Sequence, residues 1–588
     1  MCGIAGLITA NGSPPDPAIL DRLADALAHR GPDGRGRHVA GAIGLVHDRL
    51  SIIDLGTGAQ PLLDGAGHAL VANAEIYNYV ELRRDLGESQ FRTKSDCEVP
   101  LRLYGRVGLD FVDQLRGMYA IALADGARGR LVLARDPFGI KPLYYAETQH
   151  GLTFASEPQA LIAAGLVSPH MNVRARDELL AFQFTTGRAT IFQGIERVLP
   201  GELIVVEHGR IVERRRRSAL SAGAPEAIDD ASALARLDAA LNDSIGVHQR
   251  SDVPYGLFLS GGIDSAALLA GMARLNERPV RAYTIGFPGA GVHDERERAR
   301  AVARAFNAEH VDVPFTAGDF WRLLPAVAAA LDDPIADYAA VPTFRLAEIA
   351  KQDVKVVLSG EGGDEMFAGY GRYRDQLRPF WRGGPKPMRA KHKLAGLGLL
   401  REEPLDWRAG LAAVEAEARR GEWDALQRAQ AADCADWLPH DLLTKLDRCL
   451  MANGVEGRTP FLDPAVAAAA FRLPRRLKVR HGLGKWLLRR WLDERAPAAE
   501  AFSRKRGFTV PVGEWIAAES RRLGPLLARQ PAINALCRPG AVEALFAHPA
   551  GKAEAAVWHL LFYALWHRRH VDGRRPSGDA FETLADRG

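Results

Sequence analysis

The stretch Tyr-Gly-Leu-Phe-Leu-Ser-Gly-Gly-Ile-Asp-Ser at residues 255–265 decides the fold of the C-terminal half of the chain. Its apolar beginning predicts a strand over 255–259, and helix-forming residues over 265–275 follow the glycine-rich turn. Backbone N–H groups in such a turn, at the start of a helix, are suited to hold phosphate. We therefore expect an α/β unit whose first loop binds a phosphorylated ligand.

Strands and helices alternate on the C-terminal side of this turn. Further strands are expected over 281–287, 310–313 and 354–358, and helices over 294–306 and 343–351. This alternation predicts a parallel sheet with helical crossovers. Residues 372–439 predict a helical insertion with loops, and the polar tail from Val571 is expected to fray.

The N-terminal part has a different pattern, in which short strands cluster in hairpins. Strands are expected over 118–125, 130–135, 143–147, 152–156, 201–206 and 210–213, and helices over 17–28, 79–86 and 97–105. Strands grouped apart from helices predict an antiparallel α+β layered domain. An Ala/Ser/Gly/Pro-rich linker over 218–229 separates it from the α/β unit.

Size and composition are those of a globular protein with more than one domain. The 588 residues predict two or three domains, and we assign the first to 2–217 and the second to 230–570. The chain is 47% hydrophobic and 25% charged, with a net charge of only +4, so no dedicated nucleic-acid binder is indicated. The arginine run at 214–217 is either a basic patch or, as we favour, a solvated strand end.

Cysteine usage and apolar runs bear on the compartment. The five cysteines, Cys2, Cys97, Cys434, Cys449 and Cys537, form no CxxC pair and no zinc spacing. Their odd, sparse distribution is typical of a reducing compartment. No apolar run reaches the ~18–20 residues of a spanning helix, and the N-terminus lacks a signal-peptide pattern. We expect a cytoplasmic protein with no membrane partner.

A cysteine at position 2 becomes the first residue once Met1 is removed. It then carries a thiol and a free α-amine, which is a nucleophile with its own candidate base. The alternative is that Cys2 is merely a small residue after the initiator methionine. The sequence that follows favours the first interpretation.

Five polar motifs follow Cys2 in the N-terminal part. They are His29-Arg30-Gly31-Pro32-Asp33, Arg49-Leu50-Ser51-Ile52, Asn73-Ala74-Glu75-Ile76-Tyr77-Asn78, Ser95-Asp96-Cys97-Glu98 and the run Arg-Asp-Pro-Phe-Gly-Ile-Lys-Pro-Leu-Tyr at 135–144. With Cys2, they make this part similar to the class II glutamine amidotransferases. These are N-terminal nucleophile (Ntn) hydrolases, so the resemblance implies an αββα sandwich.

The resemblance implies a role for each of these residues. Arg49 would pair with the carboxylate of glutamine, and Asp96 and Glu75 with its ammonium. Asn73 and the backbone N–H of Ala74 would face the oxyanion. Leu50 and Ile52 would complete the glutamine site. The family usually has glycine where this chain has Ala74, and alanine would be strained by ~1–2 kcal/mol if that backbone required a positive φ.

The loop Ser260-Gly261-Gly262-Ile263-Asp264-Ser265 lacks the GxxxxGK[ST] pattern of a Walker motif. It resembles the PP-loop of ATP pyrophosphatases, which cleave ATP between the α and β phosphates. A second loop, Ser359-Gly360-Glu361-Gly362-Gly363-Asp364-Glu365, follows the strand expected over 354–358. Both lie at carboxyl ends of parallel strands, where such sheets bind ligands. Asp264 and Asp364 are candidate Mg²⁺ ligands, although Asp264 could instead cap a helix.

Together the two parts resemble the glutamine-hydrolysing asparagine synthetase family over essentially the full chain. Further matches are the runs at 445–448 and 454–463 and Gly484-Lys485, whereas 372–439 is not matched. The resemblance implies ATP contacts at Leu259, Ser260, Gly261, Gly262, Asp264, Ser265, Ile285, Ser359, Gly360 and Lys485. Leu259 and Ile285 would line the adenine pocket, Lys485 would meet phosphate oxygens, and Glu361 would act at the acyl-adenylate.

The reaction this implies is the amidation of aspartate to asparagine through β-aspartyl-AMP, with glutamine, ATP and Mg²⁺. The loops around 333–338 and 448–458 could provide charged partners for the α-groups of aspartate, although no residue of them is assigned singly. A first alternative is the same chemistry on another carboxylate, in a cell-surface polysaccharide or secondary-metabolite pathway. β-Lactam synthetase-like relatives are less favoured, because Cys2 and the glutamine motifs are intact. A second alternative is a catalytically silent interaction protein. The sequence leaves a homodimer open.

Overall fold

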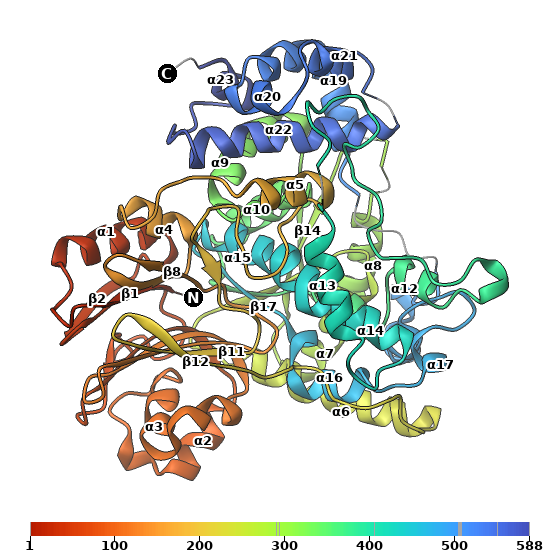
Figure 1. Ribbon diagram of the computed structural model, residues 1–588. Helices are drawn as coiled ribbons and strands as arrows, with labels where there is room; N and C mark the ends of the chain where they lie inside the picture. Colours follow the sequence, from red (N-terminus) through yellow and green to blue (C-terminus); the bar gives the residue numbers. More distant parts are fainter. Residues whose placement is uncertain are drawn as a thin grey trace.

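The computed structural model describes residues 2–289, 291–292, 294–404, 406–503, 509–549 and 551–586. An N-terminal unit of two antiparallel sheets, in red to yellow in Figure 1, lies beside a larger unit built on a parallel sheet. The chain segment between strand β12 and helix α6, which was expected to be a linker, has neither helix nor strand.

The N-terminal unit contains two six-stranded sheets, in the orders β10-β8-β9-β1-β3-β2 and β12-β11-β7-β6-β5-β4. Neighbouring strands run antiparallel, as expected. The strands are β1 (Gly3–Thr9), β2 (Gly34–Ala40), β3 (Ile43–Arg49), β4 (Leu62–Leu63), β5 (His68–Ile76), β6 (Gly117–Asp125), β7 (Arg130–Arg135), β8 (Tyr144–Thr148), β9 (Gly151–Ala155), β10 (Glu196–Arg197), β11 (Glu202–Glu207) and β12 (Arg210–Arg216).

Helices cover the outer faces of these two sheets. The inner faces share one apolar core, to which Ile4 and Leu45 contribute from one sheet and Val71 and Leu131 from the other. Helices α1 (Pro17–Leu27) and α4 (Pro158–Ala163) pack on the first sheet. On the second sheet lies α3 (Glu98–Val107), with α2 (Tyr79–Leu86) beside it. The layers are therefore αββα, and this fold expectation is confirmed.

The second unit is built on a five-stranded parallel sheet in the order β15-β14-β13-β16-β17. Its strands are β13 (Tyr255–Phe258), β14 (Arg281–Gly286), β15 (Glu309–Pro314), β16 (Val356–Leu358) and β17 (Glu456–Arg458). Four of them match the expected strands to within a few residues. The short strand β17 was not predicted, and it brings a distant part of the chain to the edge of the sheet.

Helices pack on both faces of the parallel sheet, because successive side chains of each strand point to opposite faces. Leu257, Ala282 and Leu358 pack against α6 (Asp230–His248), α7 (Ile263–Leu275) and α8 (Arg296–Ala305). On the other face lie α9 (Ala317–Ala330), α10 (Ala340–Ala350) and α15 (Thr444–Met451). The α/β expectation is confirmed.

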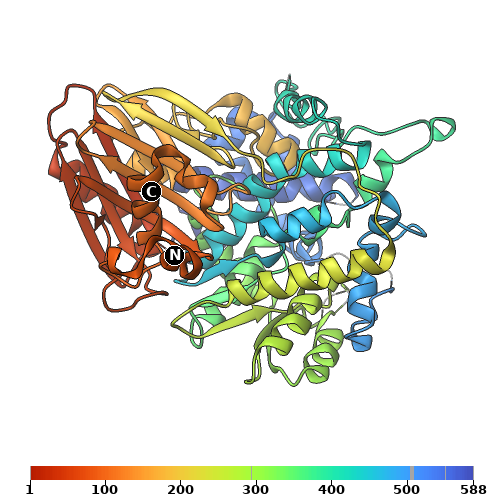
Figure 2. The ribbon, with the colours of Figure 1, turned by 90° about the horizontal axis from the view of Figure 1, so that it is seen from below.

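The remaining helices surround this core (Figures 1 and 2). They are α5 (Val173–Phe182), α11 (Gly363–Met366), α12 (Gly371–Gln376), α13 (Ala409–Ala418), α14 (Ala425–Ala432), α16 (Pro464–Ala470), α17 (Arg475–Lys478), α18 (Trp486–Asp493), α19 (Val512–Ala528), α20 (Pro531–Leu536), α21 (Ala541–Ala547), α22 (Lys552–His570) and α23 (Ala580–Ala585). A π-helical segment, η5 (Asp433–Leu443), joins α14 directly to α15. Residues 372–439 thus contain helices and loops, as expected.

The C-terminal tail is ordered, so the expectation that it frays is wrong. Helix α23 begins with a capping box, in which the side chains of Asp579 and Glu582 each accept from the other's backbone N–H. Phe581 packs on Trp321 of α9, with ring centroids 4.8 Å apart. The cap and the buried aromatic ring hold the tail against the body of the protein.

The arginine run at 214–217 is the end of strand β12, and each guanidinium lies near a carboxylate. Distances are 3.1 Å for Arg214–Glu202, 2.9 Å for Arg215–Asp110, 3.4 Å for Arg216–Glu417 and 3.5 Å for Arg217–Asp113. The strand-end interpretation is therefore confirmed. All five cysteines are buried and unbridged. Among the described residues, no helix is both long and apolar enough to cross a membrane.

Candidate active site

Cys2 lies between the two sheets of the N-terminal unit, directly before strand β1. Its backbone N–H donates to Oδ1 of Asn73 at 3.1 Å, and its Sγ lies 4.0 Å from the carbonyl oxygen of Leu50. Only 7% of the residue is exposed, and burial raises the pKa of the thiol. The predicted nucleophile and the predicted oxyanion residue are thus in direct contact. Met1 lies outside the described residues.

Asn73 sits in the middle of β5 and is fully buried. Its Oδ1 accepts from Cys2, whereas its Nδ2 has no hydrogen-bond partner among the described residues. An unpaired buried N–H group is costly and calls for an explanation. A donor of this kind beside a thiol is suited to an oxyanion that forms when the thiol attacks an amide.

Ala74 lies inside β5, paired with Tyr119 of β6, and is not among the residues with a positive φ. Extended backbone of this kind suits alanine as well as any residue. The expectation that Ala74 could strain a glycine-like turn is therefore wrong, because there is no turn at this position.

Arg49 ends strand β3, and its Nη2 donates to the carbonyl oxygens of Ile53 at 3.3 Å and Asp54 at 2.5 Å. Among the described residues it forms no ion pair with a carboxylate. This leaves the guanidinium able to receive an external carboxylate. The side chains of Leu50 and Ile52 are buried against Val356 and Met451 of the second unit, so what they offer near Cys2 is backbone, as the carbonyl of Leu50 shows.

The two predicted ammonium partners have different surroundings. Asp96 is buried, and its Oδ2 accepts from the backbone N–H of Ile76 at 2.7 Å. Burial raises the pKa of Asp96 to about 6. Glu75 is also buried, but its Oε2 lies 2.8 Å from Nη2 of Arg458 in the second unit. Binding of an ammonium by these two carboxylates remains a prediction.

A cavity of about 520 Å³ opens at the carboxyl ends of the parallel strands. The predicted residues that line it are Leu259, Ser260, Gly262, Asp264, Ser265, Ile285, Ser359, Gly360, Glu361 and Asp364. Both predicted loops thus meet at one cavity. Leu259 and Ile285 provide an apolar wall, together with Phe258 and Tyr283.

The first loop is held in shape by its own serines. Oγ of Ser265 accepts from the backbone N–H of Ser260 at 3.0 Å, and Oγ of Ser260 accepts from Gly262 at 3.1 Å. The N–H of Gly261 donates to a carboxylate oxygen of Glu295 at 3.2 Å. The N–H of Gly261 thus already binds one anionic oxygen, and a phosphate oxygen could take the same place. This supports the interpretation of the loop as a phosphate-binding loop.

The second loop packs closely on the first. A Cβ atom at Gly360 would lie 2.9 Å from Cβ of Asp264, and one at Gly363 would lie 2.5 Å from Oδ1 of Asp264. Glycine at these positions lets the two loops approach, and it explains why Asp264 and Asp364 converge.

Lys485 lies between these two aspartates. Its ammonium forms an ion pair with Asp264 and lies 2.8 Å from Oδ1 of Asp364. Burial opposes the charge on Lys485, but the two carboxylates outweigh it and raise its pKa. Two carboxylates that meet at one cation fit a Mg²⁺ ion, which prefers oxygen ligands and keeps positions for phosphate and water. Among the described residues, no group of three metal-ligating side chains is found.

Further cavity residues were not assigned from the sequence. Nζ of Lys445 donates to Oδ2 of Asp337 at 2.7 Å, and both line the cavity together with Tyr338 and Gln183. Burial raises the pKa of Glu361, and Lys445 opposes this shift. Asp337 and Tyr338 belong to the loop around 333–338, which was expected near the acceptor. Gln183 comes from the end of α5 and belongs to no recognisable motif.

The loop around 448–458, also expected near the acceptor, begins and ends with arginines that do not line the cavity. Arg448 pairs with Asp332 at 2.8 Å and Asp447 at 3.0 Å, and Arg458 pairs with Glu75. Both are fully buried between the two units. These two arginines therefore bind carboxylates at the interface and do not line the cavity, and a contact of the 448–458 loop with the acceptor remains a prediction.

Buried charges connect the thiol to the second unit. Arg30 donates from Nε to the carbonyl oxygen of Cys2 at 3.2 Å and forms two bonds of 2.8 and 3.0 Å with Asp447 of α15. Asp447 is two residues from Lys445, whose side chain lines the cavity. At the other edge, the carbonyl of Arg458 accepts from Ser359 N–H at 2.8 Å. Two short paths thus join the two sites, one through Arg30 and Asp447 and the other from Glu75 through Arg458 to Ser359.

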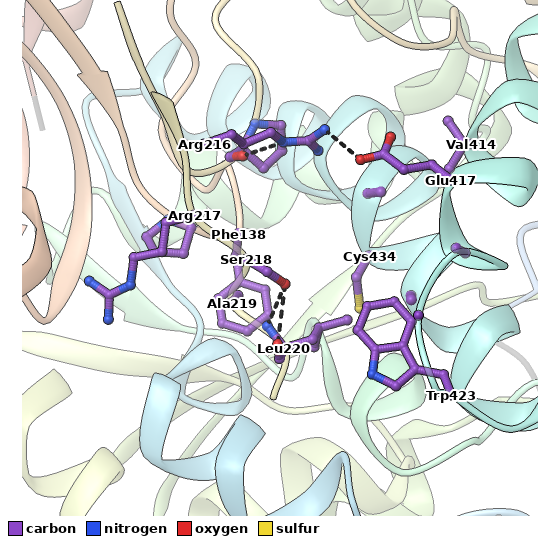
Figure 3. Close-up of a pocket in the computed structure, with 16 residues that line it drawn as sticks. Phe138, Arg216, Arg217, Ser218, Ala219, Leu220, Val414, Glu417, Trp423 and Cys434 are labelled. Atoms are coloured by element: carbon purple, nitrogen blue, oxygen red, sulfur yellow. Dashed lines mark hydrogen bonds and ion pairs between the residues drawn. The ribbon is translucent and has the colours of Figure 1, made fainter. Parts of the chain in front are cut away.

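A second cavity, of about 320 Å³, lies where strand β12 and the following segment face α13, α14 and η5 (Figure 3). Phe138, Leu220 and Trp423 line its walls, and the ion pair of Arg216 with Glu417 spans one side. None of the predicted site residues lines it, so it is separate from both sites.

The fold and the two sites together define a class of protein. A buried thiol beside an unpaired amide donor in an αββα unit is suited to hydrolyse an amide. A phosphate-type loop at a parallel sheet is suited to bind a nucleotide. Joined in one chain, they define a ligase that uses glutamine as amide donor.

Comparison with known proteins identifies the family. The family model described as "Asparagine synthase" matches residues 236–568, and that described as "Glutamine amidotransferase domain" matches residues 1–216. A protein of Mycobacterium tuberculosis (strain CDC 1551 / Oshkosh), provisionally named asparagine synthetase [glutamine-hydrolyzing], is 35% identical over 97% of this chain and 98% of its own length. The chain belongs to the glutamine-hydrolysing asparagine synthetase family.

Two further relatives show the breadth of the similarity. Asparagine synthetase [glutamine-hydrolyzing] 1 of Bacillus subtilis (strain 168) is 31% identical, over 98% of each chain. A protein with a different name, Amidase chry2 of Gibberella zeae, is 33% identical over 64% of this chain and 60% of its own length.

Proposed function

We propose that the protein amidates aspartate to asparagine, with glutamine as amide donor and ATP as activator, and that it releases AMP, pyrophosphate and glutamate. A carboxylate is a poor acyl donor, so it must be activated before ammonia can displace a leaving group. A β-aspartyl-AMP intermediate would do this. We also propose the cytoplasm as its compartment, and the unit boundaries 2–217 and 230–570 for the two activities.

In the first half of the reaction, Cys2 would attack the side-chain amide of glutamine and form a thioester. The tetrahedral oxyanion would accept hydrogen bonds from Nδ2 of Asn73 and the backbone N–H of Ala74. Arg49 would hold the carboxylate of glutamine, and Asp96 its ammonium, with Glu75 nearby. Ammonia leaves, and water then releases glutamate from the thiol.

In the second half, the aspartate carboxylate would attack the α-phosphorus of ATP and displace pyrophosphate. Leu259 and Ile285 would contact adenine, and Ser260, Gly261, Gly262, Ser265, Ser359, Gly360 and Lys485 would contact ribose or phosphates. Asp264 and Asp364 would hold Mg²⁺, which would neutralise the charge of the leaving pyrophosphate. Ammonia would then attack the acyl carbon of β-aspartyl-AMP and displace AMP, and Glu361 would accept a proton from the attacking ammonia, because burial raises the pKa of Glu361.

The observation that carries this proposal is the set of residues that line the cavity of about 520 Å³. It joins the phosphate-type loop to a separate cluster formed by Lys445, Asp337 and Glu361. A cluster with both charge signs beside a nucleotide suits a small amino acid that carries an ammonium and carboxylates.

The test is incubation with aspartate, Mg·ATP and either glutamine or ammonium. Asparagine and AMP should form in equal amounts with either nitrogen source, as measured by amino-acid and nucleotide chromatography. ADP in place of AMP would overturn the assigned site of ATP cleavage.

One observation favours an alternative in which the acceptor is not aspartate. It is the 33% identity to a relative named as an amidase rather than a synthetase. The same chemistry would then act on another carboxylate, in a cell-surface or secondary-metabolite pathway. AMP that forms only with an acid other than aspartate would support this alternative and contradict the aspartate assignment.

A further inference from the structure

Two adjacent aromatic residues stand in solvent at the end of a projecting loop. Phe380 and Trp381 are 93% and 83% exposed. Among the described residues, no other large apolar side chain is more than 56% exposed. They belong to a single turn of 3₁₀-helix, η4 (Phe380–Arg382), which we call the aromatic tip. The loop that carries it extends from α12 away from the body in both views (Figures 1 and 2).

Hydrogen bonds fix the conformation of the aromatic tip. The N–H groups of Gly383 and Gly384 donate to the carbonyls of Phe380 at 2.9 Å and Pro379 at 3.1 Å. Nη2 of Arg378 donates to the carbonyl of Arg382 at 2.7 Å. The rings are therefore presented by a closed turn. Solvent exposure of two large aromatic rings is unfavourable, so the turn presents them at a free-energy cost that a ligand surface could recover.

The base of the loop is anchored to the second unit. Met388 is buried, and Arg389 and Arg372 both donate to the buried Asp433, at 2.8 and 2.7 Å. Buried contacts therefore hold the base, and the two rings at the tip remain exposed.

Positive charge surrounds the tip. Residues 376–393 contain no Asp or Glu. Within residues 378–386, the basic residues Arg378, Arg382 and Lys386 flank the two rings in the sequence, and we call them the basic collar. Among the described residues, none of these three forms an ion pair, and Arg382 and Lys386 are exposed. The whole chain has a net charge of only +4, so this concentration is local.

We propose that the aromatic tip and basic collar dock the protein on an anionic lipid bilayer. Trp and Phe side chains are suited to the polar–apolar boundary of a bilayer. Basic residues near the surface are attracted to anionic headgroups. The protein would lie on the membrane without crossing it, which agrees with the helices of the described residues. The proposal departs from the expectation, made from the sequence alone, that the protein has no membrane partner.

Two other occupants fit less well. A second copy of this chain would bring a chain of positive net charge against the positive collar. A single-stranded nucleic acid would need aromatic platforms along a basic groove. The tip instead presents two adjacent rings on a single turn at the end of a projecting loop.

The test is co-sedimentation of the full-length protein with phosphatidylcholine vesicles, with or without about one-third phosphatidylglycerol. The wild-type protein should bind the anionic vesicles, and binding should fall as salt is raised. The tip variant Phe380→Ser/Trp381→Ser and the collar variant Arg382→Glu/Lys386→Glu should each lose at least about tenfold in partition coefficient.

Matched controls separate the loop from the general surface. Val173→Ser/Val212→Ser removes two apolar side chains that are 56% exposed on other elements. Arg278→Glu/Arg420→Glu reverses two exposed charges elsewhere that, like the collar residues, form no ion pair among the described residues. Both controls should bind within about twofold of wild type. Brominated lipid should quench tryptophan fluorescence in the wild type and less in Trp381→Phe, a change too mild to unfold the protein.

Three results would overturn the proposal. The first is wild-type binding that does not depend on anionic lipid. The second is vesicle binding by the tip and collar variants equal to that of wild type. The third is tip-dependent binding to a thymidine oligonucleotide without binding to vesicles, which would indicate a nucleic-acid partner instead.

Discussion

The side-chain nitrogen of Asn73 is buried without a partner among the described residues, next to the thiol of Cys2. We predict that Asn73→Ala lowers the kcat of glutamine hydrolysis by about 10²–10³-fold, because one oxyanion donor is lost. Ammonia-dependent amidation should remain within about twofold of wild type, because Asn73 does not line the nucleotide cavity. Cys2→Ala should abolish glutamine hydrolysis and also spare the ammonia-dependent reaction. Equal loss of both activities in Asn73→Ala would show that its role is structural.

Ala74 provides the opposite case, a departure from the family pattern without a cost. It lies in extended backbone inside β5, so Ala74→Gly relieves no strain. We predict unchanged glutamine kinetics and a loss of roughly 0.5–1 kcal/mol in stability, because glycine in a strand has more conformational entropy to lose. Steady-state kinetics and thermal unfolding measure the two effects. A higher kcat in Ala74→Gly would mean that the side chain obstructs the oxyanion.

The pKa of Asp96 determines a pH effect. Burial raises this pKa to about 6, so the carboxyl loses its negative charge as pH falls through that value. An uncharged carboxyl cannot pair with the ammonium of glutamine. We therefore predict that kcat/KM for glutamine falls about tenfold per pH unit below about 6. Asp96→Asn should have a lower kcat/KM for glutamine at every pH, and this kcat/KM should not decrease below about pH 6. A decrease that persists in Asp96→Asn would assign it to another group.

At the scale of elements, the two loops at the ends of β13 and β16 act as one site because their glycines let them meet. The carboxylates of Asp264 and Asp364 share one ammonium, that of Lys485. We predict that Asp264→Asn and Asp364→Asn each reduce ATP–pyrophosphate exchange by at least about 10²-fold, because the charge on the leaving pyrophosphate is no longer neutralised. Chelation of Mg²⁺ should have the same effect, and glutamine hydrolysis should continue in each case. Exchange that survives in both variants would show that the metal is held elsewhere.

Elements with local signals could be predicted from the sequence, and those with only distant partners could not. Strands β7 and β13 and helix α2 match closely, because apolar runs and turn residues mark them. Strand β17 has no apolar run, since it consists of Glu456, Gly457 and Arg458. It is a strand only because it pairs with β16, about a hundred residues earlier. Helix α23 was missed although its capping box could be read in the sequence, because the polar composition of the tail received more weight.

The candidate site divides in the same way. The thiol, the oxyanion residue and the two loops were found because they occur in short motifs. Gln183, Asp337 and Lys445 were not assigned, because their side chains meet only through tertiary packing. Arg448 and Arg458 belong to a loop expected near the acceptor but pair with carboxylates at the interface, since a sequence does not reveal which carboxylate a buried arginine pairs with.

At the scale of the whole molecule, buried charges at the interface join two reactions that must run at equal rates. Arg30 contacts the carbonyl of Cys2 and pairs with Asp447, and Asp447 shares helix α15 with Lys445 of the nucleotide cavity. A shift of α15 on substrate binding would therefore reach the thiol through two contacts. This contiguous path is a physical basis for coupling, and it requires a direct test.

We predict that Asp447→Asn uncouples the two reactions. The substitution removes the ion pair between Arg30 and Asp447 and leaves Glu157 as the charged partner of Arg30, so the link between the carbonyl of Cys2 and α15 is weakened. The ratio of glutamate to asparagine formed should rise above one, and each half-reaction should remain measurable alone. Asp433→Asn is the matched control, because Asp433 is also fully buried between two arginines, but both of these lie in the second unit. An unchanged ratio in Asp447→Asn, or an equal rise in Asp433→Asn, would show that coupling does not pass through α15.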